Sequence, residues 1–189
     1  MKRLLPILLL AGCSSGPVPP DWQLNSSAAM QRFTRTYLGG NTRAAEQEFL
    51  SVKQELSATG RADLMARAEL VRCAARAASL EFDNCPGFEK LRADAGAEEV
   101  AYADYLAGRG KRSVTDDALS RLVSFGVQFN SGTASPETIA AAIDVASAQG
   151  WRRPLLAWLG VQEKRAEAAG DRAALEHIRR RIFLTLEKN

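Results

Sequence analysis

Apolar and polar residues alternate along most of this chain with the period of an α-helix. Within 61–80, apolar residues recur at intervals of three or four positions, which places them on one helix face. They are Leu64, Ala68, Val71, Ala75 and Ala78. No stretch shows the alternating β-branched pattern that is typical of a strand. We therefore predict helices at 27–38, 42–58, 61–80, 88–93 and 97–107, and further helices starting near Thr115, Ser135, Pro154 and Asp171.

Capping residues mark several of these helix starts. Ser135 is followed by a proline and a glutamate, the order expected for a cap, a first helical position and an acid in the first turn. Thr115 is predicted to cap the helix that follows it, with Asp116 and Asp117 in the first turn of that helix, where the helix dipole favours acids. Asp171 is predicted to cap the last helix.

Short glycine-bearing turns between the helices predict an all-α fold of antiparallel helical hairpins, with about nine helices. Gln149-Gly150-Trp151 and Ala169-Gly170-Asp171 resemble the turns of tetratricopeptide-like (TPR-like) repeats, and this resemblance implies an α/α array with a concave or grooved surface. The Trp-x-x-Leu-Gly-x-x-Tyr run of that repeat is missing. A compact irregular helical bundle is the alternative.

The first residues differ from the helical region. Lys2 and Arg3 precede an apolar run at 4–10, which is too short to cross a membrane as a helix. The run ends in Leu10-Ala11-Gly12-Cys13, which resembles the lipobox of bacterial lipoproteins at all four positions. This resemblance implies cleavage before Cys13 and attachment of acyl chains there, enough for stable membrane anchoring. An ordinary secretory signal with a chance cysteine is the alternative.

The lipobox resemblance divides the chain into a signal peptide at 1–12, a flexible Pro- and Ser-rich tether at 13–25 and a single all-helical domain at 26–189. The prolines of the tether favour an extended conformation. Because Ser14 rather than an aspartate follows Cys13, the resemblance implies the outer membrane of a Gram-negative cell, with the domain in the periplasm.

Charge gives little indication of a nucleic-acid partner. The 189 residues include 25 Lys and Arg and 22 Asp and Glu, and the formal net charge is +3. Removal of the leader would lower this charge by two, because it contains Lys2 and Arg3 and no acid. The charges are interspersed and aromatic residues make up only 7% of the chain, so no stacking platform for single strands is predicted.

Two further cysteines are predicted to form a disulfide. With Cys13 acylated, Cys73 and Cys85 remain as a pair in an oxidising compartment. Cys73 lies inside the predicted helix at 61–80, and the loop after that helix is long enough to bring Cys85 back to it. Closing so short a loop would stabilise the fold by about 3 kcal/mol. Two buried free thiols are the alternative.

Catalytic groups are scarce in this sequence. His177 is the only histidine, so a catalytic triad or a metal cluster cannot be assembled around histidines, and it is predicted to be solvated. Cys85-Pro86 resembles the Cys-Pro haem-contact motif, but a disulfide would remove the thiolate ligand. Glu98-Glu99 and Asp116-Asp117 are neighbours on predicted helices, so their carboxylates do not face each other as glycoside hydrolysis requires. No enzymatic activity, cofactor or metal is predicted.

Trp151, Arg152, Arg153 and Trp158 are the best candidates for partner binding. The two arginines lie at a helix start, where cations are disfavoured, and arginine with tryptophan is the composition of interface hot spots. The alternative is an exposed loop with Trp151 packed as a hydrophobic staple. We expect a lipid-anchored periplasmic scaffold or adaptor that binds a protein or peptide in an envelope assembly. A carrier of a small hydrophobic ligand such as a lipid is the second expectation.

Overall fold

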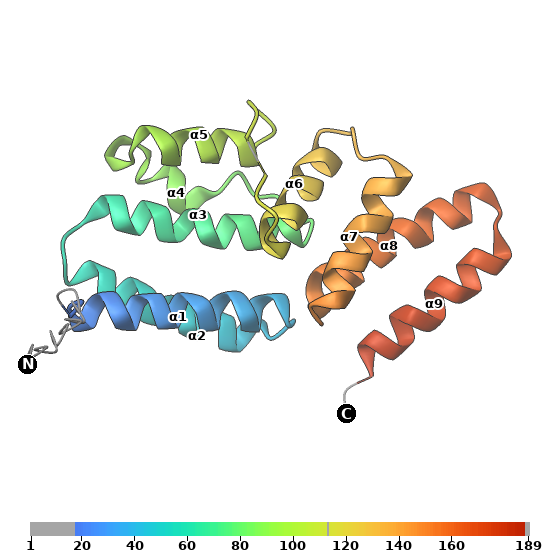
Figure 1. Cartoon of the computed structure of the whole chain (residues 1–189), viewed down its shortest axis with the longest axis horizontal. Coiled ribbons are helices and arrows are strands. Elements are labelled where there is room, and N and C mark those ends of the chain that lie inside the picture. The colour runs from blue at the N-terminus through green and yellow to red at the C-terminus, as the bar shows by residue number, and fades with distance from the viewer. Residues whose placement is uncertain (1–17, 113, 188–189) are drawn as a thin grey trace, which may run out of the picture.

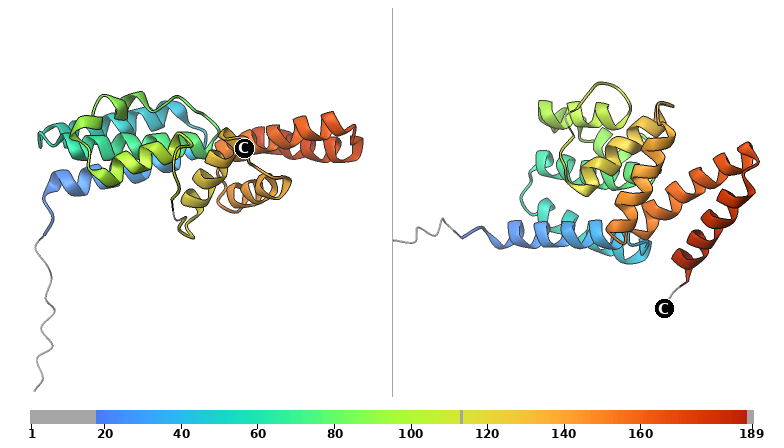
Figure 2. Two further views of the ribbon diagram at one scale, coloured as in Figure 1. Left: turned by 90° about the horizontal axis from the view of Figure 1, so that it is seen from above. Right: turned by 45° about the vertical axis from the view of Figure 1, so that its right-hand side comes forward.

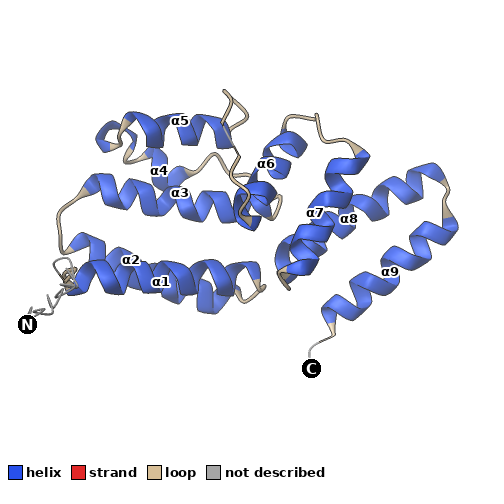
Figure 3. Cartoon of the chain, in the orientation of Figure 1, coloured by secondary structure: helices blue, strands red, loops and turns tan. Residues whose placement is uncertain are grey.

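The computed structural model describes residues 18–112 and 114–187. Within these ranges the chain forms helices and no strand (Figure 3), which confirms the predicted all-α fold. The elements in chain order are α1 (Asp21–Leu38), α2 (Thr42–Ser57), α3 (Ala62–Ala78), α4 (Pro86–Glu89), a 3-10 turn η1 (Arg92–Asp94), α5 (Ala97–Leu106), α6 (Ala118–Asn130), α7 (Pro136–Ala148), α8 (Arg152–Ala169) and α9 (Arg172–Leu186).

The helices form a layered body from which one hairpin projects. α1 and α2 pack as an antiparallel pair below α3, and α4 and α5 lie on its other side (Figure 1). α6 and α7 follow beside α3, and the α8–α9 hairpin extends away from this body (Figure 2). None of the described helices combines the length and the apolar character needed to cross a membrane. The regularity of a TPR-like array remains a prediction.

α3 holds the body together because both of its sides are buried. Ala68 and Ala75 belong to an apolar cluster formed with α1 and α2, whereas Leu70 and Ala74 belong to a second cluster that extends through α5, α6, α7 and α8. The alanines of α3 let neighbouring helices approach closely. At Gly126 of α6, an added Cβ would lie only 2.2 Å from the carbonyl oxygen of Ala77.

The first helix begins earlier than predicted, and the tether boundary at residue 25 was wrong. α1 starts at Asp21, so residues 21–25 belong to the helical domain rather than to the tether. Pro20 does not prevent this, because its carbonyl oxygen accepts hydrogen bonds from the amides of Gln23 and Leu24. A proline just before a helix is compatible with helical geometry because it lacks only an amide that would have no partner there. The predicted signal peptide at 1–12 and the lipobox cysteine lie outside the described residues.

Two other helix starts also differ from the prediction. Asp117, rather than Thr115, caps α6 and accepts a hydrogen bond from the amide of Ser120 at 2.9 Å, while the Thr115 hydroxyl donates to the Asp117 carboxylate. This hydroxyl is the largest cause of the lowered pKa of Asp117. α8 begins at Arg152 and not at Pro154. The helix can start two residues before the proline, because amides in the first turn have no helical partner and the missing amide of Pro154 therefore costs no hydrogen bond.

Candidate functional site

The tryptophan and arginines predicted to bind a partner are largely used inside the fold. Trp158 has no exposed surface, its indole nitrogen donates to the carbonyl of Ala78 at 3.2 Å, and its ring meets Phe129 edge-on at 5.7 Å. The expected role of Trp158 in partner binding was therefore wrong, because the side chain lies at the junction of α3, α6 and α8. Trp151 is half-buried and packs against both apolar clusters.

Arg153 is a structural joint rather than a free binding residue. Its guanidinium lies 4.2 Å from the ring centroid of Tyr37 and donates to the Tyr37 carbonyl at 2.8 Å. It also donates to the hydroxyl of Thr42 at 2.5 Å and pairs with Glu81 at 3.1 Å. One side chain thus joins α8 to the α1–α2 turn and to the loop after α3, and its planar fork suits several acceptors at once.

Burial and the nearby Glu81 raise the pKa of Tyr37 well above its ordinary range, so this phenol stays neutral at the joint. Arg152 has a similar but smaller role, because its Nε donates to the carbonyl of Thr185 at 2.9 Å and ties the end of α9 to the start of α8. Arg153 therefore does not provide the free surface that the sequence predicted, whereas a role of the half-buried Arg152 in partner binding stays a prediction.

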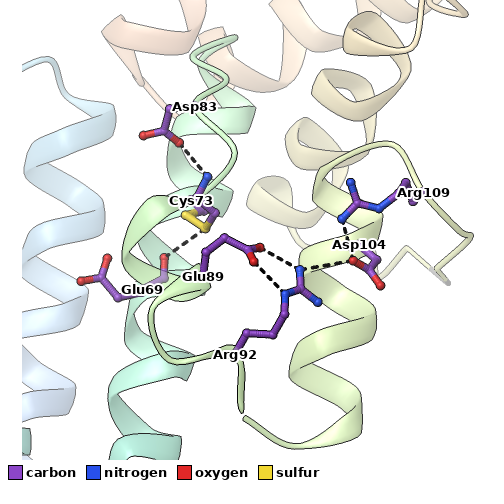
Figure 4. A network of polar contacts seen from close by, with 8 residues as sticks. Glu69, Cys73, Asp83, Glu89, Arg92, Asp104 and Arg109 are labelled. Carbon is purple, nitrogen blue, oxygen red and sulfur yellow. Dashed lines mark hydrogen bonds and ion pairs between the residues drawn. A yellow bond between two sulfur atoms is a disulfide. The ribbon is translucent and has the colours of Figure 1, made fainter. Parts of the chain in front are cut away.

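The cysteine pair lies as predicted. Cys73 of α3 and Cys85 of the following loop are bonded to each other, with their Cα atoms 5.7 Å apart. The Cys85 amide donates to the Asp83 carboxylate at 3.2 Å (Figure 4). Leu80, Asn84 and Cys85 in this loop adopt left-handed backbone conformations, which side-chain-bearing residues rarely adopt. The crosslink and the polar contacts together hold the loop against α3.

A cavity of about 220 Å³ lies beside this disulfide, and the charges around it pair with one another. Arg92 pairs with Glu89 at 2.7 Å and with Asp104 at 3.3 Å (Figure 4). Arg109 pairs with Asp104 at 2.8 Å. The hydrogen bond from Arg92 lowers the pKa of Glu89, and the one from Arg109 lowers the pKa of Asp104. These ion pairs join α4 and the 3-10 turn to α5 and to the segment after it, so these four charges are already paired within the fold.

The other candidate chemical groups are separated in the structure. His177 is exposed on α9, and Glu99 pairs with Arg67 at 2.6 Å. The Cys85 sulfur is occupied by the disulfide and is not available to haem iron. Across residues 18–112 and 114–187, no three or more His, Cys, Asp or Glu side chains gather as they would around a metal ion.

A concave surface that was not predicted from the sequence lies along α8. It is an apolar groove of about 610 Å³ between the α6–α7 connection and one side of α8, called the α8 groove below. Its lining residues are Phe129, Gly132, Ala134, Ile139, Leu156, Ala157, Gly160, Val161, Lys164, Arg165 and Ala168. The members on α8 recur at intervals of about four residues, which places them along one side of the helix.

The α8 groove is open to solvent and has a positively charged rim. Leu156, Gly160 and Val161 are half-buried, whereas Lys164 and Arg165 are exposed. In the part of the chain that the structure describes, neither of these two cations takes part in an ion pair within 4.0 Å. A Cβ added at Gly160 would meet no atom within 4 Å, so the floor of the groove has room for an approaching group.

The spacing of small and apolar residues on α8 was visible in the sequence, but it could not show which side of α8 its neighbours would leave uncovered. The fold and this groove define an all-helical protein with an open apolar groove along α8. Comparison of the chain with family models, with curated proteins and with solved structures found no match.

Proposed function

We propose that this chain is a lipid-anchored adaptor of the bacterial periplasm that binds an apolar helical segment of a partner protein. The α8 groove is the observation that carries the proposal. From Leu156 to Ala168 it follows α8 for about 18 Å at 1.5 Å per residue, enough for about three turns of a partner helix. The lipobox resemblance supports the anchor and the location at the outer membrane, and the stacked helical hairpins are in keeping with a TPR-like array.

The chemistry of the groove indicates what the partner segment should look like. Its floor is apolar and lined by small residues, which favours close approach of a helix with leucine-like side chains. Lys164 and Arg165 at the rim favour acidic residues at the edge of that helix, since complementary charges guide association and fix its register. The groove is open along its length, so a lipid in it would leave part of its chain in water. We therefore prefer a protein segment to the alternative of a small hydrophobic ligand.

Photo-crosslinking in the native envelope tests this proposal. A photoreactive side chain at Ala157, inside the groove, should capture a specific protein, and the same group at the exposed Ala101 of α5 should not. Gly160→Leu should block capture from Ala157, because the new side chain would fill space that is open next to the helix. Capture of lipid alone from Ala157 would contradict the adaptor and support the carrier.

Membrane attachment requires a separate test, because it depends on the lipobox and not on the groove. Cys13→Ser should release the protein from the outer-membrane fraction, whereas Ser14→Ala should leave it attached. Unchanged membrane retention of Cys13→Ser would contradict the anchor without affecting the argument for the groove.

A further inference from the structure

The last turn of α9 exposes three large apolar side chains. Phe183, Leu184 and Leu186 are 61%, 66% and 57% exposed. α9 packs on α8 alone in the views of Figures 1 and 2, and Ile178 is its one buried residue. A cluster of exposed large apolar side chains is typical of a surface that contacts a partner or a membrane.

Cations accompany the apolar tip. Arg179 is held by Glu163 at 2.7 Å and by Glu167 at 2.6 Å across the hairpin. Arg180, one residue further on, is exposed and makes no ion pair within 4.0 Å in the part of the chain that the structure describes. Arg181 is half-buried beside it. A projecting phenylalanine and leucines next to arginines are the composition of segments that bind at a membrane surface.

We propose that the tip of α9 (Phe183, Leu184 and Leu186 with Arg180) is a second membrane contact that inserts among anionic lipid headgroups. The end of α9 lies at the edge of the molecule (Figure 1) and contributes no residue to the α8 groove, so it suits a lipid interface better than a bound helix. Pairing with the same tip of a second copy would bring the arginines of two α9 helices together, and like charges oppose such an arrangement.

The proposed anchor keeps this contact close to the membrane, an argument that rests on the proposed function. Asp21, where α1 begins, comes eight positions after Cys13, and a fully extended chain of that length spans about 27 Å. The start of α1 therefore stays within about 27 Å of the anchored cysteine, and the domain can turn its α9 tip towards the same surface. Anionic lipids would also attract the exposed arginine, and this attraction is screened by salt.

Depth-dependent quenching in vesicles tests the contact on the full lipidated chain. A fluorophore attached through Leu184→Cys would report the tip. One attached through Ala173→Cys, exposed at the opposite end of α9 and outside the α8 groove, is the matched control. The vesicles contain phosphatidylethanolamine and phosphatidylglycerol, with bromine on the acyl chains as the quencher. Quenching should be several-fold stronger at 184 than at 173. It should fall to the level at 173 when Phe183→Ser and Leu186→Ser are added, and it should weaken in high salt.

The outcomes separate the tip from the anchor. Equal quenching at 184 and 173 in protein that floats with the vesicles would overturn the tip proposal. Efficient crosslinking of two Leu184→Cys chains through these thiols, without quenching, would overturn it in favour of a second copy. Protein that fails to float with the vesicles would contradict the anchor. In that case the same labels report the α9 tip alone. Salt-sensitive quenching at 184 would then support the membrane contact of the tip, and the absence of such quenching would overturn the tip proposal.

Discussion

Two helical glycines allow the packing of α3 against α6 to be tested with one matched substitution. Gly126 lies where these helices cross, and a Cβ there would approach the Ala77 carbonyl oxygen to 2.2 Å and its carbon to 2.9 Å. Gly160 lies on the floor of the α8 groove, and a Cβ there would meet nothing within 4 Å. Gly126→Ala and Gly160→Ala therefore make the same chemical change in a crowded and in an open place.

The expected effects have opposite signs. Alanine is favoured over glycine inside a helix by about 1 kcal/mol, and this gain applies at both positions. At Gly126 the obstacle is backbone, which cannot rotate away as a flexible side chain would, so overpacking should cost about 3 kcal/mol. We therefore expect a net loss of about 2 kcal/mol for Gly126→Ala and a gain of up to about 1 kcal/mol for Gly160→Ala.

Urea and thermal unfolding followed by circular dichroism measure both variants. In a chain of this size each kcal/mol moves the Tm by about 2–4 °C, so the two variants should differ by about 6–12 °C. Their slopes with urea should match, because neither change alters the surface exposed on unfolding. If Gly126→Ala is as stable as Gly160→Ala, the close crossing of α3 and α6 is wrong. Gly160→Ala should also reduce crosslinking from the α8 groove while the fold becomes more stable.

Three further measurements address the joint and the disulfide loop. Arg153→Ala should lower the free energy of unfolding by about 2 kcal/mol, because it removes a guanidinium that stacks on Tyr37 and makes several hydrogen bonds. Amide hydrogen exchange in the α1–α2 turn should become faster. Unchanged exchange would show that α8 is not joined to that turn. The disulfide between Cys73 and Cys85 should make the mass of the unreduced protein two hydrogens lower than that of the reduced form. Replacing both cysteines by serine should lower the free energy of unfolding by about 3 kcal/mol. The pKa of Glu89, measured by NMR titration, should lie below its ordinary value of 4.5, and in Arg92→Ala this pKa should rise towards the ordinary value. The stability that the Arg92–Glu89 pair adds is present above the ordinary pKa and is lost as the pH falls through the lowered pKa.

Local signals predicted the elements well and their limits less well. The predicted ranges for α2, α3 and α5 agree with the structure within two residues, because apolar period and turn glycines act over a few neighbouring positions. Ser135 caps α7 through the amide of Thr138 at 3.2 Å, as predicted. The start of α1 was missed because the proline-rich stretch ends at Pro20, directly before the helix. The prolines favoured an extended conformation, and we extended that prediction to the residues that follow them.

Partner-binding residues were the weakest part of the prediction, for a physical reason. Composition indicated Arg153 and Trp158 because arginine and tryptophan are common in interfaces. The same large side chains are also effective inside a fold, where their apolar area and hydrogen-bond donors are both used. The acceptors of Arg153 lie 72 residues away at Glu81 and 116 away at Tyr37, and no local pattern reveals such contacts.

The sequence by itself determined that the chain is helical, where most turns fall, and that Cys73 and Cys85 could meet, since each depends on period, capping or a short loop. Only the tertiary structure decided which helix faces stay uncovered. The α8 groove exists because α6, α7 and their connection border one side of α8 without covering it, and Phe183 is exposed because none of the described helices packs over the last turn of α9. Exposure depends on distant neighbours, and this is why these uncovered surfaces became visible only in the folded chain.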